Sequence, residues 1–382
     1  MPSAPRAPGA PHLGVALDSA GRYDADTYVR LARLAERGGL DFVTLGDSFS
    51  RPGPDALAVL ARVAPATTRI GLVPTVTTTH TEPFHVQAAV ATLDWVSRGR
   101  AGWQVDVSTT AAEARLFGRR PAAPAEEVWR EAGEVADVAG RLWDSWDDDA
   151  EIRDESTGRF VDRDRLHHVD FEGATFRVRG PSIVPRPPQG RPVVVVDATG
   201  EHARAVAARH ADVALVRADG PDGAGAVRAE LRDRAADAGR DPDTLRVLAA
   251  VTVDLGNGER THVPDLDPVH PVIAYERRGS AVVPRAGGSG APYGGGLHYA
   301  GGPVGLADLI ADWHGSGRVD GFHLTPLTPA RDLERLVNGT VTLLRHRGLA
   351  RTFYPGSTLR EHLGLARPAG RYAGARVAGG AR

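Results

Sequence analysis

The chain has no cysteine and no lysine, and these absences exclude several kinds of protein. Its 382 residues carry no thiol, which rules out disulfides, thiolate metal sites and cysteine nucleophiles. The 46 residues counted as lysine or arginine are therefore all arginine, and they are balanced by 48 acids to a formal net charge of −2. Because no basic excess favours a polyanion, we predict no nucleic acid among its partners.

Long hydrophobic runs are also missing. No stretch approaches the ~18 consecutive apolar residues that a membrane-spanning helix needs, so we predict no membrane partner. Residues 1–11 are rich in proline and alanine and lack the apolar core of a signal peptide. A composition of 42% hydrophobic and 25% charged residues is ordinary for a globular enzyme. We therefore expect a cytoplasmic protein.

What the chain does contain is an alternation of short apolar runs with segments of helical periodicity. The runs are Leu13–Asp18, Phe42–Leu45, Ile70–Thr75, Ala101–Val107, Pro192–Asp197, Val213–Val216, Leu245–Leu255 and Gly321–Leu324. Alternation of this kind predicts βα units and a parallel sheet that is covered on both faces. A doubly wound open sheet rarely needs eight units, so the predicted fold class is α/β, a (β/α)8 TIM barrel.

Three segments depart from the simple barrel, and we assign all of them to one domain over residues 1–382. An insertion spans about 146–191, and we predict a hairpin within it between His167 and Val178 around a glycine turn. A Gly-rich loop spans about 256–302, a length typical of a lid or substrate loop. A C-terminal arm spans about 350–382. The acidic run Asp144–Asp154 lacks the glycine and glutamate of a calcium loop, so we interpret it as a solvated helix end.

Polar residues stand where the first five predicted strands end. They are Asp18, Asp47, Thr77, Thr78, Gln104, Ser108 and Asp197. Each one alone is equally well explained as a cap on the next helix. Because the carboxyl ends of barrel strands converge on one bowl, the whole set predicts a ligand site there.

Metal and nucleotide motifs are weak by comparison. His80, Glu82 and His85 lack the spacing of a zinc-binding helix, and Glu82 is better explained as a favourable charge at a helix start. We predict no metal, and His80 remains a candidate for contact with a ligand. The glycines at 294–296 and 301–302 do not follow a strand of a βαβ unit, so they are no dinucleotide fingerprint.

Several short motifs point to one family. They are Thr75–Thr79 with Pro83, Ala91–Asp94, Leu142–Trp146, Pro188–Pro192, Asp320–Phe322 and Arg347–Leu349. In this order they resemble the luciferase-like flavin monooxygenases, in the branch that oxidises nitrilotriacetate, EDTA or dibenzothiophene sulfone. The resemblance implies a TIM barrel that uses reduced FMN and O2 on a small organic substrate. It also implies a separate flavin reductase and a homodimer or homotetramer.

The same resemblance assigns roles to individual residues. It places Asp47, Thr77, Thr78, Gln104 and Ser108 around the flavin. It places Thr199 and Gly200 at the FMN phosphate, and His80 and Trp129 near the flavin ring or the substrate.

The chain also departs from the family pattern. The family's fifth strand usually ends Gln-Ala-Gly-Ser-Ser, whereas this chain has Val196–Gly200 with the acid Asp197. The family's His and Tyr at the start of the fourth helix, here roughly residues 126–145, align with Ala125 and Trp129. These differences predict weaker binding of the FMN phosphate. They leave two alternatives open, a deazaflavin-dependent dehydrogenase on the same barrel and a catalytically silent ligand-binding barrel.

Overall fold

The computed structural model describes residues 9–18, 23–50, 52–256, 275–278, 281–284 and 296–373. Most of the predicted loop at 256–302 therefore lies outside the described residues, as does the end of the predicted C-terminal arm. Among the described helices, none has the length and apolar character to cross a membrane.

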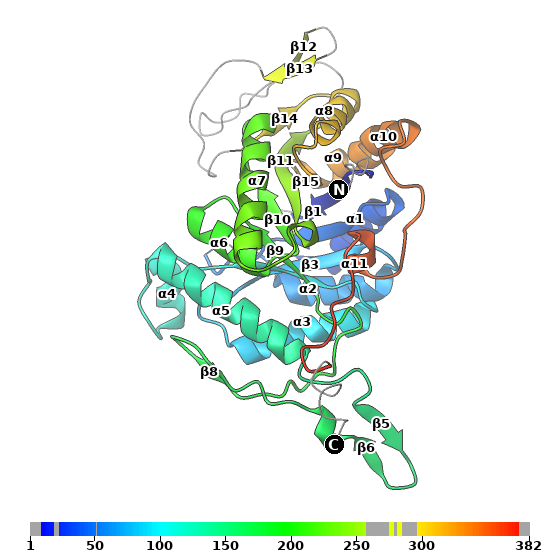
Figure 1. The fold of residues 1–382 in the computed structure, drawn as a ribbon. Helices are drawn as coiled ribbons and strands as arrows, with labels where there is room; N and C mark the ends of the chain where they lie inside the picture. Colours follow the sequence, from blue (N-terminus) through cyan, green and yellow to red (C-terminus); the bar gives the residue numbers. More distant parts are fainter. Residues whose placement is uncertain are drawn as a thin grey trace, which may run out of the picture.

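Eight parallel strands close into a barrel (Figure 1). Their order is β1, β2, β3, β4, β9, β10, β11 and β15, and β15 pairs with β1 to complete the ring. The strands are β1 His12–Ala16, β2 Phe42–Leu45, β3 Gly71–Thr77, β4 Gly102–Asp106, β9 Val193–Asp197, β10 Val213–Val216, β11 Arg246–Asp254 and β15 Gly321–Pro326. The predicted (β/α)8 fold class is confirmed, and all eight strands end at the same face.

Helices follow each strand and cover the outside of the barrel (Figure 1). They are α1 Ala25–Arg37, α2 Ala56–Val63, α3 Pro83–Ser97, α4 Ala111–Phe117, α5 Ala125–Trp143, α6 Glu201–His210, α7 Pro221–Asp237, α8 Pro303–Gly315 and α9 Pro329–Arg335, with α9 continued by a π-helical turn, Leu336–Val341, and α10 Thr342–His346. The outward residues of the strands, such as Val43 and Val105, are buried against these helices. This burial of apolar surface is the main driving force for the two-layered barrel.

The amino end of the barrel interior is closed by an apolar floor. Its residues are Phe42, Val73, Val193, Val195, Val213, Leu215, Leu248 and Ala250, joined by Leu359, Leu363 and Leu365 from the C-terminal segment. Leu359 begins the one-turn helix α11 Leu359–His362. A Cβ placed on Gly71 would lie 2.5 Å from Leu359 Cδ1, so the missing side chain at position 71 makes room for the leucine. The interior can therefore admit a ligand only from the carboxyl ends of the strands.

Several short strands lie outside the eight-stranded ring. In the segment after α5, β5 Glu151–Asp154 pairs with β6 Arg159–Val161, and β7 Phe171–Glu172 pairs with β8 Arg177–Val178. The second pair confirms the hairpin predicted between His167 and Val178, and the first projects away from the barrel in Figure 1. Elsewhere β12 Tyr275–Arg278 pairs with β13 Ala281–Pro284, and β14 His298–Ala300 pairs in parallel with the last residues of β11. Single 3-10 turns lie at Ala64–Ala66, Arg163–Arg165 and Pro242–Thr244.

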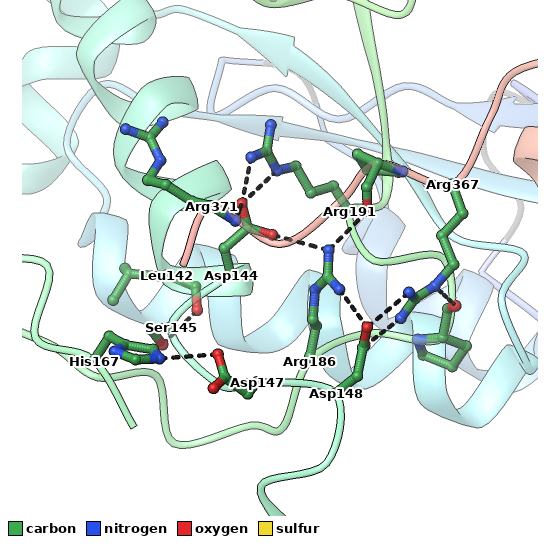
Figure 2. Close-up of polar contacts among 12 residues, drawn as sticks. Leu142, Asp144, Ser145, Asp147, Asp148, His167, Arg186, Arg191, Arg367 and Arg371 are labelled. Atoms are coloured by element: carbon green, nitrogen blue, oxygen red, sulfur yellow. Dashed lines mark hydrogen bonds and ion pairs between the residues drawn. The ribbon is translucent and has the colours of Figure 1, made fainter. Parts of the chain in front are cut away.

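The interpretation of Asp144–Asp154 as a solvated helix end is wrong at its first residue. The Asp144 side chain is fully buried just beyond α5 (Figure 2). Its two oxygens accept hydrogen bonds from Arg186 and Arg191, and the backbone N–H of Arg371 also donates to it. Sequence alone could not reveal this, because the three partners lie 42 to 227 residues away along the chain. Asp144 instead ties the inserted segment and the C-terminal segment to α5.

Candidate functional site

The barrel interior changes from apolar to polar just above its floor. Side chains alternate between the two faces of a strand, so residues two positions beyond the floor residues also point inward. Phe42 is followed in this way by Thr44, Val73 by Thr75, and Val195 by Asp197. Register extends the layer to neighbouring strands, because Gln104 lies opposite both Thr75 and Val195, and His323 lies opposite Ala250. A ring of hydrogen-bonding groups therefore lines the mouth of the barrel.

His323 lies in the middle of this layer and was missed in the sequence. Its Nε2 is 2.9 Å from Thr44 Oγ1, and its ring stacks on Phe42 with centroids 6.1 Å apart. Burial lowers the pKa of His323 to about 4, and the nearby Arg217 adds to that effect. The imidazole is therefore neutral near pH 7, with Nδ1 not bonded to any described residue. The signal for it was an isolated polar residue at the inward position of an otherwise apolar strand.

Two further polar groups in the layer have no hydrogen-bond partner among the described residues. Thr75 Oγ1 is buried without a hydrogen bond to any described residue. The side-chain amide of Gln104 likewise bonds to no described residue, although it is only half-buried. Buried polar groups in proteins are normally hydrogen-bonded, so the unmatched Thr75 hydroxyl, beside the Gln104 amide, indicates a place where a ligand supplies the missing partner.

The structure changes the expectation for the phosphate position. Asp197 does not carry an uncompensated charge, because Arg217 at the end of β10 donates to its Oδ2 from two nitrogens at 3.0 and 3.2 Å. Thr199 turns its hydroxyl toward Asp197 as well. Gly200 precedes the ten-residue helix α6 and leaves the first backbone N–H groups of that helix without a side-chain cap. An anion at this helix start would meet free N–H groups, while the Thr199 hydroxyl is already engaged.

The other predicted flavin residues divide into two groups. Thr77 points into the mouth by the same alternation as Thr75, and Ser108 is buried beside the end of β4 with its backbone N–H donating to Thr79 Oγ1. Thr78 instead donates its hydroxyl to the backbone oxygen of Asp106 at 3.0 Å, which ties β3 to β4. Asp47 accepts a hydrogen bond from the backbone N–H of Ala56 at the start of α2. Thr78 and Asp47 therefore each stabilise the backbone of the barrel, whether or not they also contact a ligand.

His80 stands at the rim in an unusual backbone conformation. Its φ is +68°, a left-handed value that is rare outside glycine and clusters at functional sites. The ring stacks on Phe117 of α4 at 4.9 Å, and Nδ1 is buried without a partner among the described residues. Burial lowers the pKa of His80, and the positive charge of Arg120 adds to this. A neutral imidazole whose Nδ1 has no partner among the described residues thus lies beside α4, after the carboxyl end of β3.

Trp129 lies apart from these residues. It belongs to the first turns of α5 and lines a cavity between α5 and α6, on the outer side of the barrel wall. The structure therefore gathers Thr77, Gln104 and Ser108 around the mouth with His80 at its rim, and it does not bring Trp129 to them. In the part of the chain that the structure describes, no group of three His, Asp or Glu side chains is placed to hold a metal.

The low pKa of His323 makes stability depend on pH. Between about pH 6.5 and 4 an unfolded histidine takes up a proton and the buried one does not, so falling pH favours unfolding. We expect the free energy of unfolding to drop by up to about 2 kcal/mol more in the parent than in His323→Gln between pH 7 and 4.5. Urea unfolding at both pH values measures the difference. Burial raises the pKa of Asp94 to about 6, so protonation of Asp94 stabilises the folded state as pH falls. This contribution is the same in the parent and in His323→Gln, so it cancels in the comparison.

A parallel eight-stranded barrel with a closed floor and an unmatched polar mouth is the architecture of a barrel enzyme. The family model described as luciferase-like monooxygenase matches residues 9–273. N-acetyl-S-(2-succino)cysteine monooxygenase of Bacillus subtilis (strain 168) is 30% identical over 403 residues, which covers 91% of each chain. Nitrilotriacetate monooxygenase component A of Aminobacter aminovorans is 32% identical over 415 residues, covering 90% of this chain and 91% of that one.

Structural comparison agrees. EDTA monooxygenase from Chelativorans sp. BNC1 matches with a TM-score of 0.79 at 23% identity, over 94% of this chain and 99% of that one. The chain belongs to the luciferase-like monooxygenase family and is an oxidoreductase. The family resemblance inferred from its motifs is confirmed.

Proposed function

We propose that this protein is a monooxygenase that uses reduced FMN and O2 to oxidise a small organic substrate at the mouth of the barrel. The observation that carries the proposal is the polar layer above the apolar floor, in which Thr75 Oγ1 is buried without a partner among the described residues and the Gln104 amide and His323 line the same mouth. A flavin ring has an apolar body and an edge of hydrogen-bonding atoms. It therefore suits a site with an apolar floor and scattered polar groups. Family membership supports the same assignment.

The residues present fit a flavin. Thr75, Gln104 and His323 would bond to the polar edge of the ring, and Thr77 and Ser108 would line its sides. The uncapped start of α6 at Gly200 would receive the phosphate, next to an Asp197 that Arg217 neutralises. Reduced flavin supplies the two electrons with which one oxygen atom enters the substrate and the other leaves as water.

The chain's own contribution is positioning and exclusion of water. A neutral His323 can give or take one hydrogen bond without placing a charge under the ring. His80 and Phe117 would shield part of the rim, since their stacked rings join the loop after β3 to α4. Because water exclusion strengthens every polar contact inside a site, this rim would protect the reaction as well as hold the ligands.

We infer that a separate reductase supplies the reduced flavin. The name of the Aminobacter relative, component A, indicates that other members of the family work with a second component. The sequence has no dinucleotide fingerprint of its own with which to take electrons from a nicotinamide. The proposal includes a homodimer or homotetramer that acts in the cytoplasm. Analytical ultracentrifugation of the purified chain tests the assembly.

Anaerobic titration with reduced FMN tests the function, with oxidised FMN and a reduced deazaflavin as parallel arms. We expect saturable binding of reduced FMN below high micromolar concentrations, and consumption of O2 when air is admitted. Saturable binding of the deazaflavin alone would support the dehydrogenase alternative instead. If neither flavin binds, the barrel is a silent binding protein and the proposal fails.

A further inference from the structure

Two cavities on the outside of the barrel form one groove between α5 and α6. The larger, of about 530 Å³, contains Trp129 and Phe171, and the smaller, of about 150 Å³, reaches the amino ends of β9 and β10. Asp137, Arg209 and His210 line both cavities, so the groove is continuous. Along α5 it extends from Glu126 to Trp143, eighteen residues or about 25 Å of helix.

The larger end of the groove combines aromatic surface with acids. Trp129 and Phe171 are each half-buried, and Glu126 and Glu134 stand on the wall beside them. Carboxylates accept hydrogen bonds and aromatic faces stack on flat rings. This end therefore suits an aromatic heterocycle that carries N–H and hydroxyl donors. Its volume lies within the range of small-molecule sites.

The smaller end is rich in positive charge. Its wall holds five arginines, Arg191, Arg209, Arg240, Arg360 and Arg371, against the two carboxylates Asp137 and Asp212. Asp212 is already committed, because it accepts two hydrogen bonds from Arg360 at 2.8 and 3.1 Å and one from the backbone N–H of Val194.

Arg191 is already paired with the buried Asp144, and the other three arginines are poorly compensated. Arg240 donates to the backbone oxygens of Ala207, Ala208 and Ala211 and to no carboxylate of a described residue, and burial lowers its pKa. Arg371 is 3.7 Å from Asp137 at its nearest, and the Arg209 side chain has no partner among the described residues. Guanidinium groups arranged around a small cavity are the usual recognition elements for phosphate.

We propose that this groove is a second ligand site, for a nucleotide with two or more phosphates. The base and ribose lie against Trp129 between the acids, and the phosphates lie among the arginines. Arg360 and Arg371 come from the C-terminal segment, so the ligand would also bind that segment to α5 and α6. The site is separate from the barrel mouth, and the inference does not depend on the proposed oxidation.

Calorimetric titration with ADP at constant ionic strength tests the site, with adenosine and inorganic pyrophosphate as separate arms. We expect ADP to bind saturably and at least about tenfold more tightly than either fragment. Arg209→Gln is expected to weaken ADP and pyrophosphate roughly tenfold and to leave adenosine unchanged. Trp129→Leu is expected to weaken ADP and adenosine and to spare pyrophosphate.

Arg163→Gln is the matched control. Arg163 is exposed on the 3-10 turn Arg163–Arg165 and has no ion pair with a described residue, so its loss removes one charge without touching the groove. Binding of ADP no stronger than that of pyrophosphate would overturn the proposal. So would an unchanged ADP affinity in Arg209→Gln. Displacement of reduced FMN by ADP would place the nucleotide at the mouth and overturn it as well.

Discussion

Replacing Gln104 with tryptophan is expected to abolish saturable binding of reduced FMN. Gln104 is half-buried on β4 and points inward between Thr75 and Val195. An indole at this position would occupy the space above the apolar floor that the flavin ring requires. The loss expected is at least about a hundredfold in affinity, equivalent to about 2.7 kcal/mol. Anaerobic titration of the purified variant measures it.

Two companion variants separate blockage from general damage. Gln104→Leu keeps the size of the side chain but removes its hydrogen bonds, and we expect it to weaken binding roughly tenfold. Val96→Trp adds the same indole on the exposed face of α3, and it should bind flavin as the parent does. Unaltered flavin affinity in a folded Gln104→Trp protein would show that the flavin does not bind at the mouth of the barrel.

Replacing Asp144 with alanine is expected to lower the free energy of unfolding by about 3–5 kcal/mol. The change leaves two guanidinium groups without the buried carboxylate that they share, and the Arg186 side chain is only 4% exposed (Figure 2). A buried charge that loses its partner retains its full cost of desolvation. Urea unfolding, followed by circular dichroism, measures the change.

Asp148 provides the comparison within the same cluster. It accepts hydrogen bonds from Arg186 and Arg367, but its side chain is 53% exposed and water can replace those contacts. We expect Asp148→Ala to cost less than about 1 kcal/mol. Equal losses in the two variants would show that burial of Asp144 does not determine its importance.

The fold could be predicted because each βα unit has a sequence pattern that can be recognised within a short stretch of the chain. Short apolar runs such as Val193–Val196 and the helical periodicity between them require only near neighbours in the chain. The way the barrel is closed at its floor could not be predicted in this way. Leu359 comes from a segment with little periodicity, and it enters the barrel only because Gly71 leaves space for it.

The site was predictable in outline and not in detail. The predicted strand ends located the mouth of the barrel. The alternation of side chains along β3 and β4 then brings Thr77 and Gln104 to that mouth. Sequence could not tell that the Thr78 hydroxyl is used by the backbone of Asp106, because that hydrogen bond joins two strands. Nor could it tell that Arg217 balances Asp197, since the pairing depends on the register of β9 with β10.

The crystal structure of the protein with FMN, grown and frozen under reducing conditions, tests the central claim most directly. We expect the isoalloxazine ring above the apolar floor, with polar atoms within hydrogen-bond distance of Thr75, Gln104 and His323 and the phosphate at the start of α6. Flavin bound instead against Trp129 in the groove between α5 and α6, with the mouth empty, would contradict it.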